Sequence, residues 1–337
     1  MNDNFSEISE IETRFLPKKL SSLLLASSYD RIGYQFKYDR VLNCGTFLEF
    51  AHEIDSSGIV SEKGKLHNAN FCRDRLCPMC SWRRSFKIFS QVSQIMDYIQ
   101  NDYEFLFLSL TSPSVPGELL SKTITRQLIA FNKMTHCKRF KDSVCGYFRS
   151  LEVTRNNDIF SKSYGLYHPH LHIVLAVPKR YFKSKLYISQ SEWLEMWQHY
   201  FGDLMISQVD VRKVRPKISG DTIDIKSAIC EVSKYAAKDK DYLIPGDFNL
   251  TDDIVLTLSR SLASRRLCSY GGIFKETWKM LRLDDAEDGD LIYLDGEINS
   301  SLSYLILRYG WSSGCYKLSD SFVKKPLLDT IETTSSE

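Results

Sequence analysis

Three cysteines lie within nine residues of one another, at Cys72, Cys77 and Cys80. A proline directly after Cys77 favours the short turn in which two thiolates face one tetrahedral ion, and Cys72 is close enough to supply a third. Zn²⁺ takes four sulfur or nitrogen ligands in structural sites, and Cys44 or His67 can provide the fourth. We therefore predict a structural zinc site with no coordination position left open for water.

Three of the seven histidines form an alternating run, at His168, His170 and His172. Side chains two residues apart in a strand share a face, so His170 and His172 can bind one metal ion. A third protein ligand, preferably a carboxylate, would suit Mg²⁺ or Mn²⁺, with water or substrate completing the shell. In a hairpin whose loop spans residues 155–167, Glu152 pairs with His170. Glu152 is thus the preferred third ligand, and His168 is the alternative.

A third group of reactive side chains lies in the sequence EVSKYAAK, residues 231–238. Residues 225–238 have a helical pattern, and steps of three, four and seven residues place several polar side chains on one stripe: Glu231, Tyr235, Lys238 and Tyr242. A tyrosine hydroxyl is a poor nucleophile near neutral pH unless positive charge favours its phenolate form, and Lys234 and Lys238 are near Tyr235. Alone, this pattern is typical of an exposed ion-pair face. It indicates a catalytic nucleophile only if a metal site lies nearby.

Strand and helix signals alternate through the middle of the chain, and these elements must position the reactive groups. Apolar or alternating runs predict strands at residues 105–111, 147–154, 170–177 and 206–214. A capping box of Ser189 and Glu192 predicts the start of a helix that Gly202 ends. Strands separated by helices, with one hairpin among them, predict an α+β fold with helices packed on an antiparallel central sheet, plus a small zinc-binding module.

The patterns divide the chain into four regions. We predict an N-terminal amphipathic arm (1–40), a zinc-binding module with a basic helix (41–100), a domain carrying the histidines (101–245), and a C-terminal accessory region with an acidic tail (246–337). One face of the basic helix is apolar, with Phe86, Phe89, Val92, Met96 and Ile99 at helical spacing. The other face is basic, with Arg83, Arg84 and Lys87. We expect Arg83 and Arg84, together with Arg73 and Arg75 nearby, to contact nucleic-acid phosphates.

The composition argues against a membrane-spanning protein and against a secreted disulfide scaffold. The chain has 337 residues, of which 43% are apolar and 26% charged, enough for two or three globular domains. Its longest apolar runs fall far short of the roughly 20 residues of a membrane span, and its polar N-terminus does not resemble a secretory signal. Nine cysteines, an odd number, are few for a secreted disulfide scaffold. We expect a soluble cytoplasmic protein with no membrane partner.

The charge is unevenly distributed, although the net charge is only +2. Residues 284–337 carry 11 acidic and 4 basic residues, whereas residues 1–283 carry 40 basic and 31 acidic residues. A basic body is the electrostatic pattern expected of a protein that contacts phosphates. The acidic tail can limit non-specific binding to DNA or hold a partner.

Together these motifs resemble one family. The order FLSLTSP, HPHLHIVLAV and EVSKYAAK, preceded by NFCRDRLCPMCSWRR, is similar to that of the plasmid rolling-circle replication initiators (Rep proteins) of Gram-positive bacteria, within the HUH endonuclease superfamily. The resemblance runs from about Cys44 to the stretch RRLCSYGGIFK at residues 265–275. It implies the HUH nuclease fold for residues 101–245.

The resemblance also implies a role for each reactive group. His170 and His172 match the HUH metal-binding motif, Tyr235 matches the nicking tyrosine, and Glu231 matches a glutamate that activates water at termination. Glu152 stands where related nucleases place a third metal ligand. The implied substrate is origin DNA, single-stranded or cruciform at the nick site, cut with Mg²⁺ or Mn²⁺ to leave a 5′-phosphotyrosine and a free 3′-OH. A host helicase and polymerase are the implied partners.

Two other functions fit parts of the pattern. A transposase or mobilisation relaxase would use the same nuclease chemistry, with Tyr242 as a second nucleophile. A zinc-containing DNA-binding regulator without catalysis would use the histidines only structurally. Nicking of single-stranded DNA that depends on a divalent ion distinguishes the enzymes from the regulator.

Overall fold

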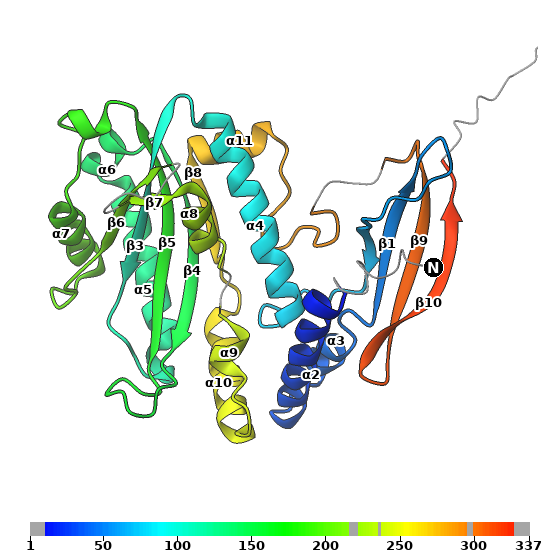
Figure 1. The fold of residues 1–337 in the computed structure, drawn as a ribbon. Coiled ribbons are helices and arrows are strands. Elements are labelled where there is room, and N and C mark those ends of the chain that lie inside the picture. Colours follow the sequence, from blue (N-terminus) through cyan, green and yellow to red (C-terminus); the bar gives the residue numbers. More distant parts are fainter. Residues whose placement is uncertain (1–10, 216–221, 235–236, 295–298, 327–337) are drawn as a thin grey trace, which may run out of the picture.

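The computed structural model describes residues 11–215, 222–234, 237–294 and 299–326. It contains two sheets, with helices packed between and around them (Figure 1). The predicted α+β class is confirmed. Within the described residues, no helix combines the length and the apolar composition that a bilayer span requires.

The larger sheet has six strands in the order β7-β6-β3-β5-β4-β8. All neighbours pair antiparallel except β6 and β7, which form a three-residue parallel pairing at one edge. The strands are β3 (Tyr103–Thr111), β4 (Gly146–Arg155), β5 (Tyr167–Pro178), β6 (Asp210–Arg215), β7 (Thr222–Asp224) and β8 (Cys268–Gly272). The apolar runs predicted as strands therefore form the centre of this sheet, in β3, β4 and β5.

Helices cover both faces of the six-stranded sheet (Figure 1). One face carries α5 (Gly117–His136), α6 (Lys138–Ser143) and α7 (Gln190–Phe201), and the other carries α4 (Pro78–Ile99), α8 (Ile225–Val232) and α11 (Ile273–Met280). The predicted start and end of α7 are confirmed. Ser189 and Glu192 form the capping box, and Gly202 ends the helix with a left-handed φ of 74°. Trp193 and Trp197 on this helix are completely buried.

The smaller sheet has the order β10-β9-β1-β2 and is antiparallel throughout. Its strands are β1 (Phe47–Ile54), β2 (Lys65–Ala69), β9 (Ser303–Ser312) and β10 (Cys315–Lys324). Strand pairing therefore crosses the predicted regions. Strands β9 and β10 of the C-terminal region complete the sheet of the zinc-binding module, and β8 extends the larger sheet beyond residue 245.

Residues 11–42 form helices that pack against the body. A short π-helix (Ile11–Phe15) leads into α2 (Leu16–Arg31), and α3 (Gln35–Leu42) follows. Helix α2 contacts α4, α3 and α10 (Phe248–Leu262). Its buried stripe is partly polar, since Lys19, Ser22 and Ser28 are completely buried. The predicted amphipathic arm is thus an integral helix layer, and two short elements complete the fold: η2 (Tyr181–Lys183) and α9 (Asp239–Tyr242).

Candidate metal centres

The hairpin of β4 and β5 brings Glu152, His170 and His172 together on one face of the six-stranded sheet. Glu152 lies opposite His170 in the strand register, and His172 is two residues further along β5. The Glu152 Oε2 atom lies 3.0 Å from His172 Nε2 and 3.5 Å from His170 Nε2. The predicted pairing of Glu152 with His170 is therefore confirmed.

Hydrogen bonds and an ion pair keep this carboxylate charged. Glu152 is 2% exposed, and Lys238 Nζ lies 3.0 Å from its Oε1. Burial alone would raise the pKa of Glu152, but hydrogen bonds from His170, His172 and Lys238 hold that pKa well below its usual value. Burial would lower the pKa of Lys238, but its hydrogen bond and ion pair with Glu152 raise it. Both side chains are therefore charged near neutral pH.

The group fits a divalent cation in its donor chemistry and its spacing. One carboxylate oxygen and two imidazole nitrogens lie within 4.8 Å of one another. Six ligands at about 2.1 Å from an ion would separate neighbouring ligand atoms by roughly 3.0 Å. The measured separations of 3.0 and 3.5 Å from Glu152 Oε2 to the two imidazoles are close to that value. Glu152, His170 and His172 can thus hold a metal ion, with further positions left for water or substrate.

His168, the alternative third ligand, is not part of this group. Its ring centroid lies 5.0 Å from that of His170, and its backbone pairs with Thr154 rather than with Glu152. Burial lowers the pKa of His168, so its imidazole is predominantly neutral. His168 therefore provides a natural control for the other two histidines, because it lies on the same strand and the same face.

The segment after α8 differs from the prediction. Helix α8 ends at Val232, where the Ser233 hydroxyl donates to the Ile229 carbonyl, and Lys238 has an extended backbone. The predicted continuous helix over residues 225–238 is therefore wrong, and so is the single stripe of side chains along it. Tyr235 lies outside the described residues, so its assignment as the nucleophile stays a prediction.

The charged residues on either side of Tyr235 contact different partners. Lys234 forms an ion pair with Glu231 at the end of α8. Lys238 instead reaches Glu152 in the metal-binding group. This long-range contact links the EVSKYAAK segment to the strand face that carries the histidines.

Tyr242 occupies a different environment from the one predicted. It is completely buried, and its hydroxyl donates to the backbone carbonyl of Leu76. Burial raises the pKa of Tyr242 well above its usual value. A buried, hydrogen-bonded hydroxyl of this kind is not accessible to DNA, so its proposed use as a second nucleophile is wrong. Tyr242 instead connects α9 to the loop that carries Cys77.

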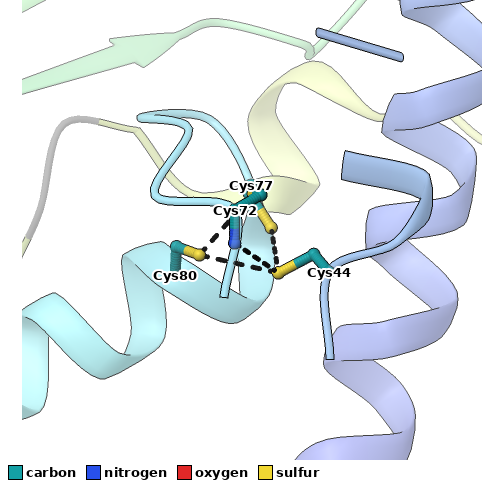
Figure 2. Close-up of side chains that lie close together, drawn as sticks. All are labelled: Cys44, Cys72, Cys77 and Cys80. Carbon is teal, nitrogen blue, oxygen red and sulfur yellow. Dashed lines mark hydrogen bonds between the residues drawn. The ribbon is translucent and has the colours of Figure 1, made fainter. Parts of the chain in front are cut away.

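The four cysteines form a compact cluster (Figure 2). The Sγ atom of Cys44 lies 3.6 Å from the Sγ atoms of Cys77 and Cys80, and Cys72 Sγ lies 3.7 Å from Cys80 Sγ. Four sulfurs at about 2.3 Å from a tetrahedral ion would lie roughly 3.8 Å apart. The sulfur spacing therefore fits a zinc ion and is much too long for a disulfide bond. The cluster is 0–7% exposed, which leaves no open position for substrate.

Backbone amides and one buried lysine surround the sulfurs. Three backbone amides donate to them: Cys72 N to Cys44, Asp74 N to Cys72 and Arg73 N to Cys80. Lys19 is completely buried, and its Nζ donates to the carbonyls of Leu42 and Cys44, both at 2.8 Å. Burial raises the pKa of the Cys80 thiol, so a deprotonated cluster needs cations nearby. A metal ion and Lys19 would supply that positive charge.

His67, the other candidate for the fourth zinc ligand, lies outside the cluster. Its Nδ1 atom is 3.4 Å from the Tyr293 hydroxyl, and its Nε2 atom is 3.4 Å from Lys324 Nζ. Cys44 instead groups with the other three cysteines. The structure therefore assigns the fourth position to Cys44.

The basic face of α4 is buried, contrary to the prediction. Arg83, Arg84 and Lys87 are 6%, 2% and 5% exposed, whereas Phe86 on the predicted apolar face is 40% exposed. Most of their partners lie in the acidic segment 284–292: the carbonyls of Leu291, Ile292 and Glu287 for the arginines, and the Asp284 carboxylate for Lys87. Arg84 also donates to the carbonyls of Arg73 and Asp74. The prediction that Arg83 and Arg84 contact DNA phosphates is therefore wrong. Part of the acidic tail thus covers this face, with backbone carbonyls for the arginines and a carboxylate for Lys87.

Several buried charged residues were not predicted from the sequence, including Lys19 and Glu287. Lys19 lies beside the cysteine cluster, and Glu287 accepts hydrogen bonds from the backbone amides of Leu267 and Cys268 at the start of β8. The sequence offers little signal for Lys19, because the buried side of α2 also carries Ser22 and Ser28. No local pattern marks Glu287, because its partners belong to a loop and a strand about 20 residues earlier.

Comparison with known proteins identifies the family. A model of the replication protein family matches residues 63–316. A Rep protein of Bacillus amyloliquefaciens is 37% identical over 302 residues, which cover 83% of this chain and 85% of the relative. One of Streptococcus pneumoniae is 36% identical over 283 residues, covering 82% of each chain. No solved structure matches the chain. The resemblance seen in the motifs is thus confirmed, and the chain belongs to the replication protein family of plasmid Rep proteins.

Proposed function

We propose that this Rep protein initiates rolling-circle replication by nicking one strand of a plasmid origin. The observation that carries the proposal is the convergence of Glu152, His170 and His172 beside Lys238, three residues after Tyr235. We further propose that the six-stranded sheet and its helices have the HUH nuclease fold. The antiparallel β4–β5 hairpin, with its metal-binding group on one face, supports this assignment.

In the proposed reaction, the phenolate oxygen of Tyr235 attacks the phosphorus atom of the scissile phosphate. The bond from phosphorus to the 3′-oxygen breaks, and that oxygen takes up a proton to become a free 3′-OH. The product strand stays on the protein as a 5′-phosphotyrosine, which conserves the phosphodiester bond energy for rejoining. Lys234 and Lys238, on either side of Tyr235, favour the phenolate over the phenol.

The other residues hold the phosphate and end the reaction. A divalent ion bound by Glu152, His170 and His172 would supply Lewis-acid polarisation of the scissile phosphate. Lys238 keeps Glu152 oriented through the contact at 3.0 Å. At termination, Glu231 accepts a proton from water and so permits hydrolysis in place of a second transesterification.

The cysteine cluster has a structural function in this proposal. A zinc ion bound by Cys44, Cys72, Cys77 and Cys80 would join the start of α4 to the end of α3, next to the Tyr242 contact. The protein would act in the cytoplasm on the double-strand origin. A host helicase would unwind the nicked plasmid, and a host polymerase would extend the 3′-OH.

The proposal is tested with a supercoiled plasmid that carries the replicon's own origin. Wild-type protein with Mg²⁺ or Mn²⁺ should nick one strand and form a protein-DNA adduct that survives denaturing electrophoresis. Tyr235→Phe should bind the origin but neither nick nor form the adduct, whereas Tyr242→Phe should do both. Glu231→Ala should form the adduct but release product poorly. An adduct that persists in Tyr235→Phe would overturn the proposed nucleophile.

A further inference from the structure

A cavity lies beside the metal-binding group, at the junction of α2, α4 and the segment that follows residue 236. Its volume is about 250 Å³, and its walls include Lys18, Trp82, Lys234, Lys238 and Asp239. The buried Tyr242 also lines it, with its hydroxyl bonded to the Leu76 carbonyl. Lys238 belongs to both sites, because its side chain lines the cavity while its Nζ lies 3.0 Å from Glu152 Oε1. The cavity and the metal-binding group therefore share a wall.

The charge of the cavity favours an anion. Three lysines and one carboxylate, Asp239, line it. Lys18 pairs with Asp239 at 3.0 Å, and Lys234 pairs with Glu231. The four side chains of these two pairs are 25–36% exposed, so the pairs are weak and a phosphate can replace a carboxylate partner at little cost. Lys238 remains paired with the buried Glu152.

Trp82 gives the cavity an aromatic wall. The Trp82 ring is partly buried and packs edge-to-face on Phe15, with ring centroids 5.1 Å apart. Phe15 is itself 2% exposed, so it is a fixed support for the indole. A fixed aromatic ring beside lysines is the arrangement with which proteins bind single-stranded nucleic acid, through base stacking and phosphate contacts.

We propose that this cavity binds one nucleotide of single-stranded DNA next to the scissile phosphate. Its base stacks on Trp82, and its phosphate contacts Lys18 and Lys234. This inference rests on the proposed nicking function in one respect: that function identifies the bound strand as the nicked strand of the origin. Trp82 follows Cys80 by two residues on α4. The helix that begins at the cysteine cluster would therefore also contact the substrate.

Binding of a fluorescein-labelled (dT)12 oligonucleotide to full-length protein tests the proposal, because stacking does not depend on origin sequence. Trp82→Ala should weaken binding roughly tenfold, since stacking of one base contributes about 1–3 kcal/mol. Trp82→Phe should stay within roughly threefold of wild type, because the aromatic face remains. Trp278→Ala removes a tryptophan outside the cavity and should bind normally. Thermal melts verify that each variant is folded.

Two further measurements localise the nucleotide. Lys18→Ala should reduce the slope of log K against log[salt] by roughly 0.7, the value for one phosphate contact to a single strand. Ultraviolet irradiation of wild-type protein with an oligonucleotide containing 5-iodo-deoxyuridine should crosslink the peptide that contains Trp82. Crosslinks confined to other peptides, with wild-type affinity in Trp82→Ala, would overturn the proposal.

The same variants separate this inference from the proposed function. If wild-type protein does not nick its origin but (dT)12 binding still requires Trp82, the cavity assignment stands and the nicking function fails. If wild-type protein nicks and Trp82→Ala binds and nicks equally well, the cavity assignment fails and the nicking function stands.

Discussion

The two candidate metal centres differ in how completely the protein surrounds them. The cysteine cluster has four sulfur ligands that are at most 7% exposed, with backbone amides directed at the sulfurs. The Glu152 group has three ligands, and the side chain of His170 is 14% exposed. A closed shell of thiolates stabilises a fold, whereas an open shell of imidazole and carboxylate leaves positions for a reacting group. The same chain thus offers one site suited to structure and one suited to chemistry.

Removal of one cysteine ligand should have the largest effect. We expect Cys77→Ser to lose zinc and to lower the free energy of unfolding by at least about 5 kcal/mol, because structural zinc binding contributes directly to folding. Metal analysis and thermal unfolding measure both quantities. Cys230→Ser, which changes an exposed cysteine on α8, should retain zinc and wild-type stability. A folded, active Cys77→Ser protein without zinc would contradict the structural role of the cysteine cluster.

Removal of one histidine ligand should instead affect activity. We expect His170→Ala to reduce the rate of nicking by about 10³-fold or more, because Lewis-acid stabilisation amounts to several kcal/mol. Its zinc content should match that of wild type. His168→Ala, on the same strand face, should nick within roughly threefold of wild type. If His168→Ala were as inactive as His170→Ala, the metal-binding group would have to include His168.

A third change tests the charge balance of the closed site. Lys19→Met should lower the free energy of unfolding by about 1–3 kcal/mol, since the carbonyls of Leu42 and Cys44 lose a charged donor. We also expect zinc to be removed more readily by a chelator. Stability and chelator resistance equal to wild type would show that the buried lysine does not support the cluster.

The smallest effect is expected at the link between the EVSKYAAK segment and the open site. Lys238→Met should slow nicking about tenfold, because Glu152 loses the cation that orients it. The Lys238 side chain is 42% exposed, but its partner Glu152 is only 3% exposed. Loss of the lysine should therefore lower the free energy of unfolding by about 1 kcal/mol, while the two histidines still contact the buried carboxylate. Single-turnover nicking and urea unfolding measure the two effects. A large loss of stability with normal nicking would make Lys238 a purely structural residue.

Local sequence signals were sufficient for the Glu152 group and for three of the four cysteine ligands, whereas the choice of Cys44 over His67 required the structure. The spacing of Cys72, Cys77 and Cys80 and the alternation of His170 and His172 depend only on turn and strand geometry. A hairpin fixes the register between neighbouring strands, so it also placed Glu152 opposite His170. These features were predictable because each lies within one turn or one hairpin.

Long-range contacts explain the predictions that failed. Arg83 and Lys87 have a helical polar pattern, but their partners lie about 200 residues away, in the segment 284–292. Helix α8 ends at Val232, and the chain beyond it instead makes distant contacts, among them Lys238 with Glu152 and Tyr242 with Leu76. Helical periodicity does not contain information about either contact.

The division between a closed and an open site is tested most directly by selective metal removal. Purified protein is dialysed against EDTA, and then its zinc content, its thermal unfolding and its nicking of origin plasmid are measured before and after addition of Mn²⁺ or Mg²⁺. We predict about one zinc per chain and an unchanged melting temperature after dialysis, because the four cysteine ligands are at most 7% exposed. We also predict no nicking in EDTA and full recovery of nicking with the added ion. Nicking that persists in EDTA, or that disappears together with zinc and returns only with zinc, would contradict the account.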